Sequence, residues 1–368
     1  MLIGIDCRLW NQTGVGRYTR NLIINLQMLD KKNNYVLFVR SEDYEDVKLQ
    51  ISNSKFKISN CDIPWHSLEE QINFPQIINK ENLDLMHFPY FSVPYFYKKP
   101  YIVTIHDLIV NKFNTGKAST LPIFLYWIKR VGYRFILSNV LKNAKKIIVP
   151  SETVKSNILE NYHWVKKEKI IITYEGGFEY EANTEFPFKG KYFLRVGNFY
   201  PHKNVDILLL AFREFVKDYP QVKLALVGRK DFFYKRVIEK VEQLNLGKNV
   251  VFIENPDDKK LYSLYKNSVA TIVPSFMEGF SLTAVEAMAA GSPLILSDIP
   301  VHREICKDSA IYFDPKKPKD LTLILKLILN DLKTRKDLKE KGFLVVRKFS
   351  WEKMAKETLK AYTSANSA

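Results

Sequence analysis

Short apolar runs alternate with helix-like stretches along almost the whole chain, and this alternation restricts the possible folds more than any other feature. In the first half, the runs expected to form strands cover residues 2–6, 35–39, 83–88, 101–105, 146–149 and 170–173. In the second half they cover residues 193–197, 222–227, 249–253, 270–273 and 293–296, with helices expected to begin near Asn204, Phe233, Asp258 and Ser281. Strands that alternate with helices are typical of doubly wound parallel sheets. The sequence therefore predicts an α/β protein with two Rossmann-like domains that face each other across a cleft.

The boundary between the halves is expected in residues 176–190, because this segment has no regular period and is rich in helix- and strand-breaking residues. We expect an amino-terminal domain over residues 1–178 and a carboxy-terminal domain over residues 190–349. Ser350 is a candidate N-cap for a final amphipathic helix. The length of 368 residues suits two domains, because single cores usually stop growing beyond roughly 250 residues.

Two carboxylates, Glu278 and Glu286, lie on either side of a predicted junction between a strand and a helix. The helix is expected over Leu282–Ala290, and Gly291 ends it. The unpaired backbone N–H groups at its start, on Phe280, Ser281 and Leu282, can bind a phosphate, while the carboxylates can accept hydrogen bonds from hydroxyls. A nucleotide sugar needs both. For an isolated pair of glutamates, the alternative is that Glu278 is a solvated loop residue and that Glu286 lies on the polar edge of an amphipathic helix.

Further motifs occur at the ends of other predicted strands. They are GNFYPHKN at Gly197–Asn204, LIGID at Leu2–Asp6 followed by GVGRY at Gly14–Tyr18, TIHD at Thr104–Asp107, and FSW at Phe349–Trp351. Together with the two glutamates these blocks resemble, in the same order, the motifs of the retaining glycosyltransferases of family 4, which have the GT-B fold. Many members carry a basic residue where this chain has Asn198 or His202, so Lys203 is expected to supply the only full positive charge of its loop.

The resemblance implies transfer of a sugar from a nucleotide diphosphate donor, with retention of configuration and without a metal. Glu278 would then accept hydrogen bonds from the donor sugar, Lys203 would neutralise the diphosphate, and His106 would contact the donor sugar or back the acceptor. Glu286 would hold the ribose. The remaining donor-binding residues would be Gly14, Gly16, Arg17, Gly197, Asn198, Arg229, Gly279, Phe280, Ser281 and Leu282. The resemblance also implies that residues 350–368 pack back on the first domain.

Neither a metal nor another cofactor is expected. No two aspartates are two positions apart, so the Asp-x-Asp pair that holds the ion in the other major glycosyltransferase architecture is missing. Cys7, Cys61 and Cys306 lack metal-type spacing and are expected to be ordinary thiols in a reducing compartment. Gly14-Val-Gly16 lacks the third glycine of the dinucleotide fingerprint, because Thr19 occupies that position.

The formal charge of +16 is unevenly spread along the chain. Residues 101–150 hold eight basic residues against one acidic residue, a local balance of +7. In the helix expected within residues 121–146, Trp127, Tyr133 and Phe135 are interleaved with Lys129, Arg130 and Arg134. This pattern suits an anionic membrane surface. A helix that packs on the core with a solvated basic edge is the alternative. Because no signal sequence or apolar span is found, we expect a cytoplasmic protein, peripheral at the inner membrane face.

The principal prediction is a hexosyltransferase, for mannose or a similar sugar, that acts on a glycan or lipid-linked acceptor in cell-surface polysaccharide synthesis. A nucleotide-sugar epimerase or hydrolase of the same fold is an alternative, with Asp6 and Asp107 as its only obvious acids. A basic polyanion-binding protein is another, although no nucleic-acid motif is present and nucleic acid is not an expected partner. GDP-linked and UDP-linked donors are both compatible, because the loops around Asn198, Arg229 and Ile253 carry no readable code for the base.

Overall fold

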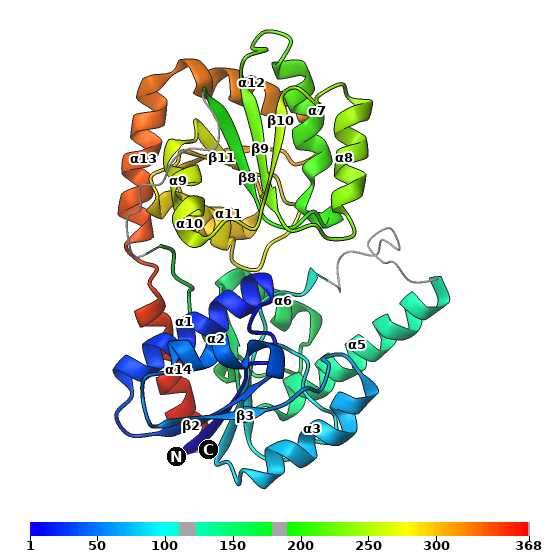
Figure 1. The fold of residues 1–368 in the computed structure, drawn as a ribbon, viewed down its shortest axis with the longest axis vertical. Coiled ribbons are helices and arrows are strands. Elements are labelled where there is room, and N and C mark those ends of the chain that lie inside the picture. Colours follow the sequence, from blue (N-terminus) through cyan, green and yellow to red (C-terminus); the bar gives the residue numbers. More distant parts are fainter. Residues whose placement is uncertain (110–122, 179–189, 367–368) are drawn as a thin grey trace. The chain divides into compact units, whose positions relative to one another are not determined.

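The computed structural model describes residues 1–109, 123–178 and 190–366, and the chain divides into two compact units (Figure 1). Unit 1 comprises residues 1–175 together with residues 350–368, and unit 2 comprises residues 176–349. Each unit has a parallel sheet with helices on it. The two sheets confirm the predicted α/β class with two Rossmann-like units.

Unit 1 contains a seven-stranded parallel sheet in the order β3-β2-β1-β4-β5-β6-β7. Its strands are β1 (Leu2–Asp6), β2 (Asn34–Val39), β3 (Phe56–Asn60), β4 (Leu85–Phe88), β5 (Tyr101–Thr104), β6 (Lys146–Val149) and β7 (Ile170–Ile172). The strand order reverses between β1 and β4, which pair directly. Ligands of open α/β sheets bind outside the carboxyl ends of the strands at such a reversal.

The helices of unit 1 come from both ends of the chain. They are α1 (Thr13–Leu29), α2 (Tyr44–Gln50), α3 (Leu68–Lys80), α5 (Ile123–Asn143), α6 (Glu152–Asn161) and α14 (Trp351–Asn366), with short 3₁₀ turns η1 (Ser41–Asp43) and η3 (Lys167–Lys169). The Oγ atom of Ser350 accepts a hydrogen bond from the Lys353 N–H at the start of α14. Helix α14, red in Figure 1, packs against α1. The Tyr362 hydroxyl of α14 lies 2.8 Å from Nδ1 of His87 in β4.

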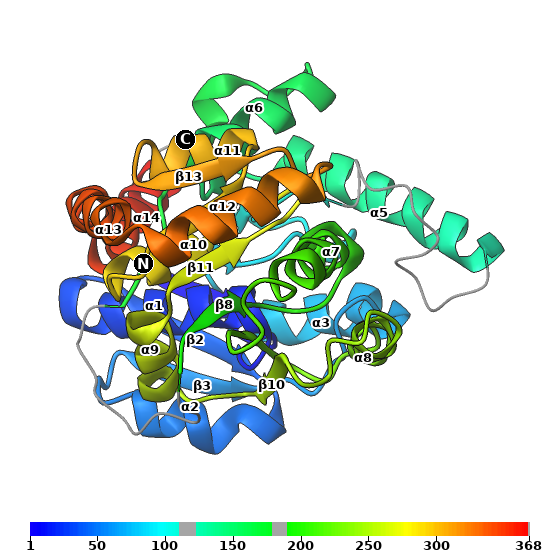
Figure 2. The ribbon, with the colours of Figure 1, turned by 90° about the horizontal axis from the view of Figure 1, so that it is seen from above.

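Unit 2 contains a six-stranded parallel sheet in the order β10-β9-β8-β11-β12-β13. Its strands are β8 (Tyr192–Val196), β9 (Lys223–Gly228), β10 (Val250–Glu254), β11 (Ala270–Val273), β12 (Leu294–Ser297) and β13 (Ala310–Phe313). Its helices are α7 (Val205–Phe215), α8 (Tyr234–Gln243), α9 (Asp258–Asn267), α10 (Leu282–Ala289), α11 (Pro300–Cys306), α12 (Pro318–Asn330) and α13 (Leu332–Val346), with the 3₁₀ turn η4 (Pro201–Lys203). Figure 2 shows α12 near α7, with which it packs. The strand order reverses between β8 and β11.

The structure differs from the sequence-based expectation at two strands and at two glycines. Strands β3 and β13 were not expected; both lie at sheet edges, β3 contains polar residues, and β13 has only four residues. Gly14 and Gly16 lie in the first turn of α1 and not in a loop ahead of it. Cys7, Cys61 and Cys306 are free and buried.

Candidate functional site

An ion pair at the strand reversal of unit 2 joins the two loops that follow β8 and β11. The Nζ atom of Lys203 lies 2.8 and 2.7 Å from the two carboxylate oxygens of Glu278. The Ser275 hydroxyl donates to Glu278 Oε1 at 2.6 Å. The backbone N–H of Phe276 donates to the His202 carbonyl at 2.8 Å, which ties the two loops together directly. The lysine and the first glutamate of the predicted site therefore contact each other.

The charges of this cluster control its protonation. Burial by itself would raise the pKa of Glu278, but the Lys203 ammonium and the Ser275 hydroxyl lower the pKa to about 2. Burial and the neighbouring Lys203 ammonium together lower the pKa of His202 to about 4. At neutral pH the cluster therefore holds an ionised Glu278 and a neutral His202.

Arg195 forms hydrogen bonds to the backbone of the loop that follows β8. The sequence analysis did not identify this residue. Its side chain is 2% exposed and donates to the carbonyl oxygens of Gly197 and Asn198. Burial lowers the pKa of Arg195 to about 10. Gly197 has a φ of +127°, which favours glycine at this position. The only sequence signal was a basic residue inside an otherwise apolar strand.

Asn204 fixes the other end of the same loop. It adopts a left-handed φ of +53°, and its side-chain amide donates to the carbonyl oxygens of Pro274 and Pro315 at 3.0 and 2.8 Å. Two further residues carry buried polar atoms that have no hydrogen-bond partner among the described residues. These atoms are Oδ1 of Asn198 and Oγ of Ser281, the N-cap residue of α10. Both lie on the loops that carry the ion pair, so they are available to a ligand.

The second glutamate has a different environment from the first. Glu286 lies on α10, is 4% exposed, and accepts a hydrogen bond from the Tyr265 hydroxyl at 2.9 Å. Phe280 is buried and packs edge-on against Phe349, with the ring centroids 5.6 Å apart. Gly279 and Leu282 lie on either side of the α10 N-cap. Arg229 is exposed directly after β9, at the same edge of the sheet.

The predicted site residues of unit 1 form a separate group. A Cβ atom on Gly16 would lie 2.2 Å from the Trp10 carbonyl oxygen, so only glycine fits there, whereas a Cβ on Gly14 would meet nothing within 4 Å. Arg17 lies one residue further along α1 and is partly buried. A close backbone approach therefore requires glycine at Gly16 but not at Gly14.

His106 follows β5, and both of its ring nitrogens contact other groups of unit 1. Nε2 lies 2.9 Å from the Pro89 carbonyl oxygen, and Nδ1 lies 3.3 Å from Oε1 of Glu175. Since a carbonyl oxygen only accepts, Nε2 carries a proton. The carboxylate of the neighbouring Asp107 accepts a hydrogen bond from the backbone N–H of Ile109. Glu175, 69 residues away in sequence, was missed because no local pattern connects it to His106.

The basic aromatic helix is α5, and its exposed face is smaller than the sequence suggested. Trp127 and Phe135 are 52% and 58% exposed, but Arg130 is 5% exposed, and Tyr133 packs against the core. Arg130 is therefore not a surface charge. Leu121 and the side chain of Lys129 lie outside the described residues. None of the described helices is long and apolar enough to cross a membrane.

Within residues 1–109, 123–178 and 190–366, no group of three or more His, Cys, Asp or Glu side chains is arranged to hold a metal ion.

Family models match nearly the whole chain in two consecutive parts. Residues 12–176 match the model for glycosyltransferase family 4, and residues 178–345 match the model for glycosyl transferases group 1.

Several curated relatives are mannosyltransferases. The chain is 30% identical over 234 residues to the O-antigen chain mannosyltransferase RfbU of Salmonella typhimurium, which covers 63% of this chain and 65% of that protein. It is 23% identical over 381 residues to the O-antigen chain mannosyltransferase B of Escherichia coli, with 95% of this chain and 96% of that protein covered. The chain thus spans a little under two thirds of the first relative and nearly all of the second.

Solved structures share the fold over almost the full length. Sucrose-phosphate synthase from Thermosynechococcus elongatus has a TM-score of 0.81 at 21% identity, with 99% of this chain and 98% of that chain covered. Anabaena HepE, solved in complex with UDP and glucose, has a TM-score of 0.78 at 14% identity, with 99% and 100% covered. At these identities the likeness establishes the fold alone.

Proposed function

The chain belongs to the glycosyl transferases of group 1, with an amino-terminal glycosyltransferase family 4 domain, and we propose that it transfers a hexosyl unit from a nucleotide diphosphate sugar. Mannose or a similar hexose is the proposed sugar, because the O-antigen relatives are mannosyltransferases. The proposed acceptor is a glycan or a lipid-linked glycan used in surface polysaccharide synthesis.

One observation carries the proposal: the Lys203–Glu278 ion pair lies on the same loops as the unpaired Ser281 hydroxyl at the start of α10. The N-terminus of a helix attracts anions through its free N–H groups and its dipole. A diphosphate at this point would therefore meet the α10 N–H groups, the Ser281 hydroxyl and the Lys203 ammonium. Glu278 would accept hydrogen bonds from the sugar hydroxyls, and Glu286 from the ribose.

The proposed reaction needs no metal and retains the configuration of the sugar. Lys203, Arg17 and the helix terminus would stabilise the negative charge that develops on the leaving diphosphate, and electrostatic stabilisation of this kind usually contributes more to catalysis than any other effect. Glu278 and Glu286 belong to one strand–loop–helix segment, whereas the paired carboxylates of glycosidases flank the scissile bond. We therefore propose a front-face reaction in which the departing diphosphate takes the proton of the acceptor hydroxyl.

His106 is proposed to act on the acceptor side or against the donor sugar. Its ring is held in place by Pro89 and Glu175. In this position the imidazole ring would pack against the sugar and orient it. A substrate that bound either ring nitrogen would first have to replace one of these two contacts.

Thermal unfolding with a panel of nucleotides tests the donor site. A preferred ligand at 100 times its dissociation constant should add about 2.7 kcal/mol to the free energy of unfolding. GDP, UDP and their mannose and glucose conjugates are the probes, and product analysis with an acceptor then distinguishes transfer from epimerisation or hydrolysis. Failure of every nucleoside diphosphate to stabilise the protein would contradict the proposal, as would release of diphosphate without a new glycosidic bond.

We further propose that α5 brings unit 1 to an anionic membrane surface. Trp127 and Phe135 are exposed on this helix, and Arg134 and Lys142 are exposed beside them. Aromatic rings can enter the headgroup region while basic residues are attracted to anionic lipids. Such a contact at the inner membrane face would place the enzyme near a lipid-linked acceptor.

A further inference from the structure

A buried ionic cluster lies at the strand reversal of unit 1, where β1 and β4 end. The Arg8 guanidinium donates to both carboxylate oxygens of Asp6 at 2.9 and 2.7 Å and to Oε1 of Glu70 at 2.7 Å. The side chains of Arg8 and Glu70 are 1% and 0% exposed. The guanidinium carbon lies 3.7 Å from the centre of the Phe74 ring, over its face. The Arg8 guanidinium is therefore held on one side by two carboxylates and on another by an aromatic ring.

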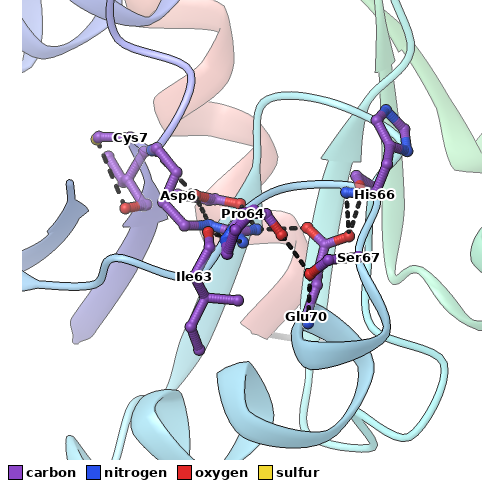
Figure 3. A network of polar contacts seen from close by, with 10 residues as sticks. Asp6, Cys7, Ile63, Pro64, His66, Ser67 and Glu70 are labelled. Carbon is purple, nitrogen blue, oxygen red and sulfur yellow. Dashed lines mark hydrogen bonds and ion pairs between the residues drawn. The ribbon is translucent and has the colours of Figure 1, made fainter.

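Glu70 connects this cluster to two loops at the same edge of the sheet (Figure 3). Its Oε2 atom accepts from the backbone N–H of His66 at 2.9 Å, in the loop between β3 and α3. The same oxygen accepts from the Ser92 hydroxyl at 2.7 Å, in the loop after β4. Arg8 also donates to the Ile63 carbonyl at 3.1 Å. Glu70 therefore links the loop after β3 to the loop after β4.

The two fixed loops present a group of aromatic rings, which we call the aromatic shelf: Trp65, His66 and Tyr90. The His66 ring lies edge-on to Trp65 and to Tyr90, with centroid distances of 5.0 and 5.8 Å. Trp65 is 37% exposed. Figure 3 shows the backbone of His66 turned toward Glu70 while its imidazole points away from the cluster. The rings are thus partly exposed at the edge where open α/β sheets bind ligands.

We propose that the aromatic shelf binds a hexose ring of the acceptor glycan. This inference rests on the proposed glycosyl transfer and names the acceptor subsite within it. A pyranose presents a flat C–H face that can pack on an indole, while its hydroxyls need polar partners such as an imidazole or a phenol. Tyrosine and tryptophan combine an apolar body with a polar tip, which suits ligands of this mixed character.

The charges around the shelf favour a neutral sugar over an anionic lipid. Residues 58–79 contain no lysine or arginine, but they contain Asp62, Glu69 and Glu70. Asp62 and Glu69 are exposed, so this surface would repel a phosphate headgroup. The shelf therefore differs from α5, whose exposed aromatic rings lie beside basic residues.

The experiment measures binding of neutral oligosaccharides to the full chain without donor. Mannotriose, maltotriose and cellotriose are the probes, followed by calorimetry or ligand-observed NMR. Loss of the stacking ring in Trp65→Ala should weaken binding of the preferred probe about tenfold, and Trp65→Phe should recover most of it. The matched control is Trp164→Ala, because Trp164 is 51% exposed but lies between α6 and β7, where the chain returns to the amino ends of the strands. Circular dichroism and thermal unfolding check that each variant folds.

Kinetics provide the second measurement. Trp65→Ala should raise the KM for the acceptor while the KM for the donor stays at the wild-type value. Glu70→Gln, which removes the charge that holds both loops, should raise the acceptor KM in the same direction. An unchanged acceptor KM and unchanged probe binding in folded Trp65→Ala would overturn the proposal, and so would the absence of Trp65-dependent binding to any of the three sugars.

Two further outcomes separate the possible errors. If Trp65→Ala loses partition onto vesicles that contain anionic lipid but keeps wild-type sugar binding, the shelf is a lipid contact and the proposal is wrong. If Trp65-dependent sugar binding is found in a protein that binds no nucleotide sugar, the glycan subsite is supported and the proposed transfer reaction is wrong.

Discussion

The ammonium group of Lys203 is paired with both carboxylate oxygens of Glu278, at 2.8 and 2.7 Å. The positive charge expected to meet a diphosphate is therefore shared with the carboxylate expected to meet the sugar. A donor that binds here must accept part of the Lys203 charge while its hydroxyls replace part of the contact to Glu278. In the proposed mechanism the pair would therefore couple recognition of the phosphates to recognition of the sugar.

Removing one partner of this pair should separate the two tasks. Lys203→Ala and Glu278→Gln should each lower kcat/KM by roughly 100-fold, because each loses a group that acts in the transition state. Binding of the nucleoside diphosphate alone should weaken in Lys203→Ala but persist in Glu278→Gln, since that change leaves the ammonium free. Calorimetry with GDP and UDP measures this difference.

Glu214→Gln is the control, because Glu214 forms an exposed ion pair with Lys217 at 2.6 Å in the same unit. Wild-type turnover and wild-type nucleotide binding in Lys203→Ala would show that the diphosphate site is wrongly assigned.

Activity should survive the complete removal of divalent metals. In the proposed mechanism the Lys203 ammonium, Arg17 and the start of α10 supply the positive charge that a metal supplies in other enzymes. The measurement is turnover after treatment with EDTA and passage over a chelating resin, with metal content determined in parallel. A loss of activity that Mg²⁺ or Mn²⁺ restores would contradict the mechanism.

The two glycines at the start of α1 should respond to alanine in opposite ways. Gly16→Ala would place a Cβ atom 2.2 Å from the Trp10 carbonyl oxygen, and the overpacking should cost about 1–3 kcal/mol of the free energy of unfolding. Gly14→Ala meets nothing within 4 Å, and alanine is the better helix former by about 1 kcal/mol. Urea unfolding of both variants measures the difference. If the two variants have equal free energies of unfolding, the backbone around Gly16 accommodates the added Cβ atom without loss of stability, and the prediction is wrong.

The sequence predicted those features that depend on local pattern. Buried parallel strands such as β11 read as apolar runs, and Glu278 and Glu286 lie where the strand–loop–helix pattern placed them. The contacts between distant residues could not be predicted. Glu70 is 62 residues from Arg8, so the pairing depends on the order of the strands in the folded sheet.

A similar limit applies to residues whose role depends on burial. Nothing around Arg195 in the sequence indicates that its guanidinium turns back to hold the Gly197 carbonyl. The interleaving of basic and aromatic residues grouped Arg130 with side chains suited to a membrane surface, but the folded unit buries it. In each case the environment is created by segments that are distant in the chain.

Stability should fall as the pH drops from about 6.5 toward 3, partly because of His87. Burial lowers the pKa of His87 to about 3 from its ordinary value of 6.5. In this window the unfolded chain binds a proton at this residue and the folded protein does not, so stability falls by about 1.4 kcal/mol per pH unit. His87→Gln should reduce that slope by about one proton, whereas the exposed His163→Gln should leave it unchanged. The free energy of unfolding in urea at several pH values measures the slopes, and identical slopes in all three proteins would contradict the prediction.

Binding to anionic vesicles should depend on the exposed residues of α5 and not on net charge alone. The double change Arg134→Glu and Lys142→Glu should lower partition at least tenfold, because each basic residue near an anionic surface contributes about 1 kcal/mol. Trp127→Ser and Phe135→Ser should lower it further by removing the rings that enter the interface.

The matched control is Lys333→Glu with Lys336→Glu on α13, which makes the same change in net charge at exposed positions of unit 2. Arg130 is left unchanged because it is buried. Cosedimentation at low and high salt measures the partition. An equal loss in both double variants would mean that charge alone drives binding, and equal partition onto neutral and anionic vesicles would exclude α5 as an electrostatic membrane contact.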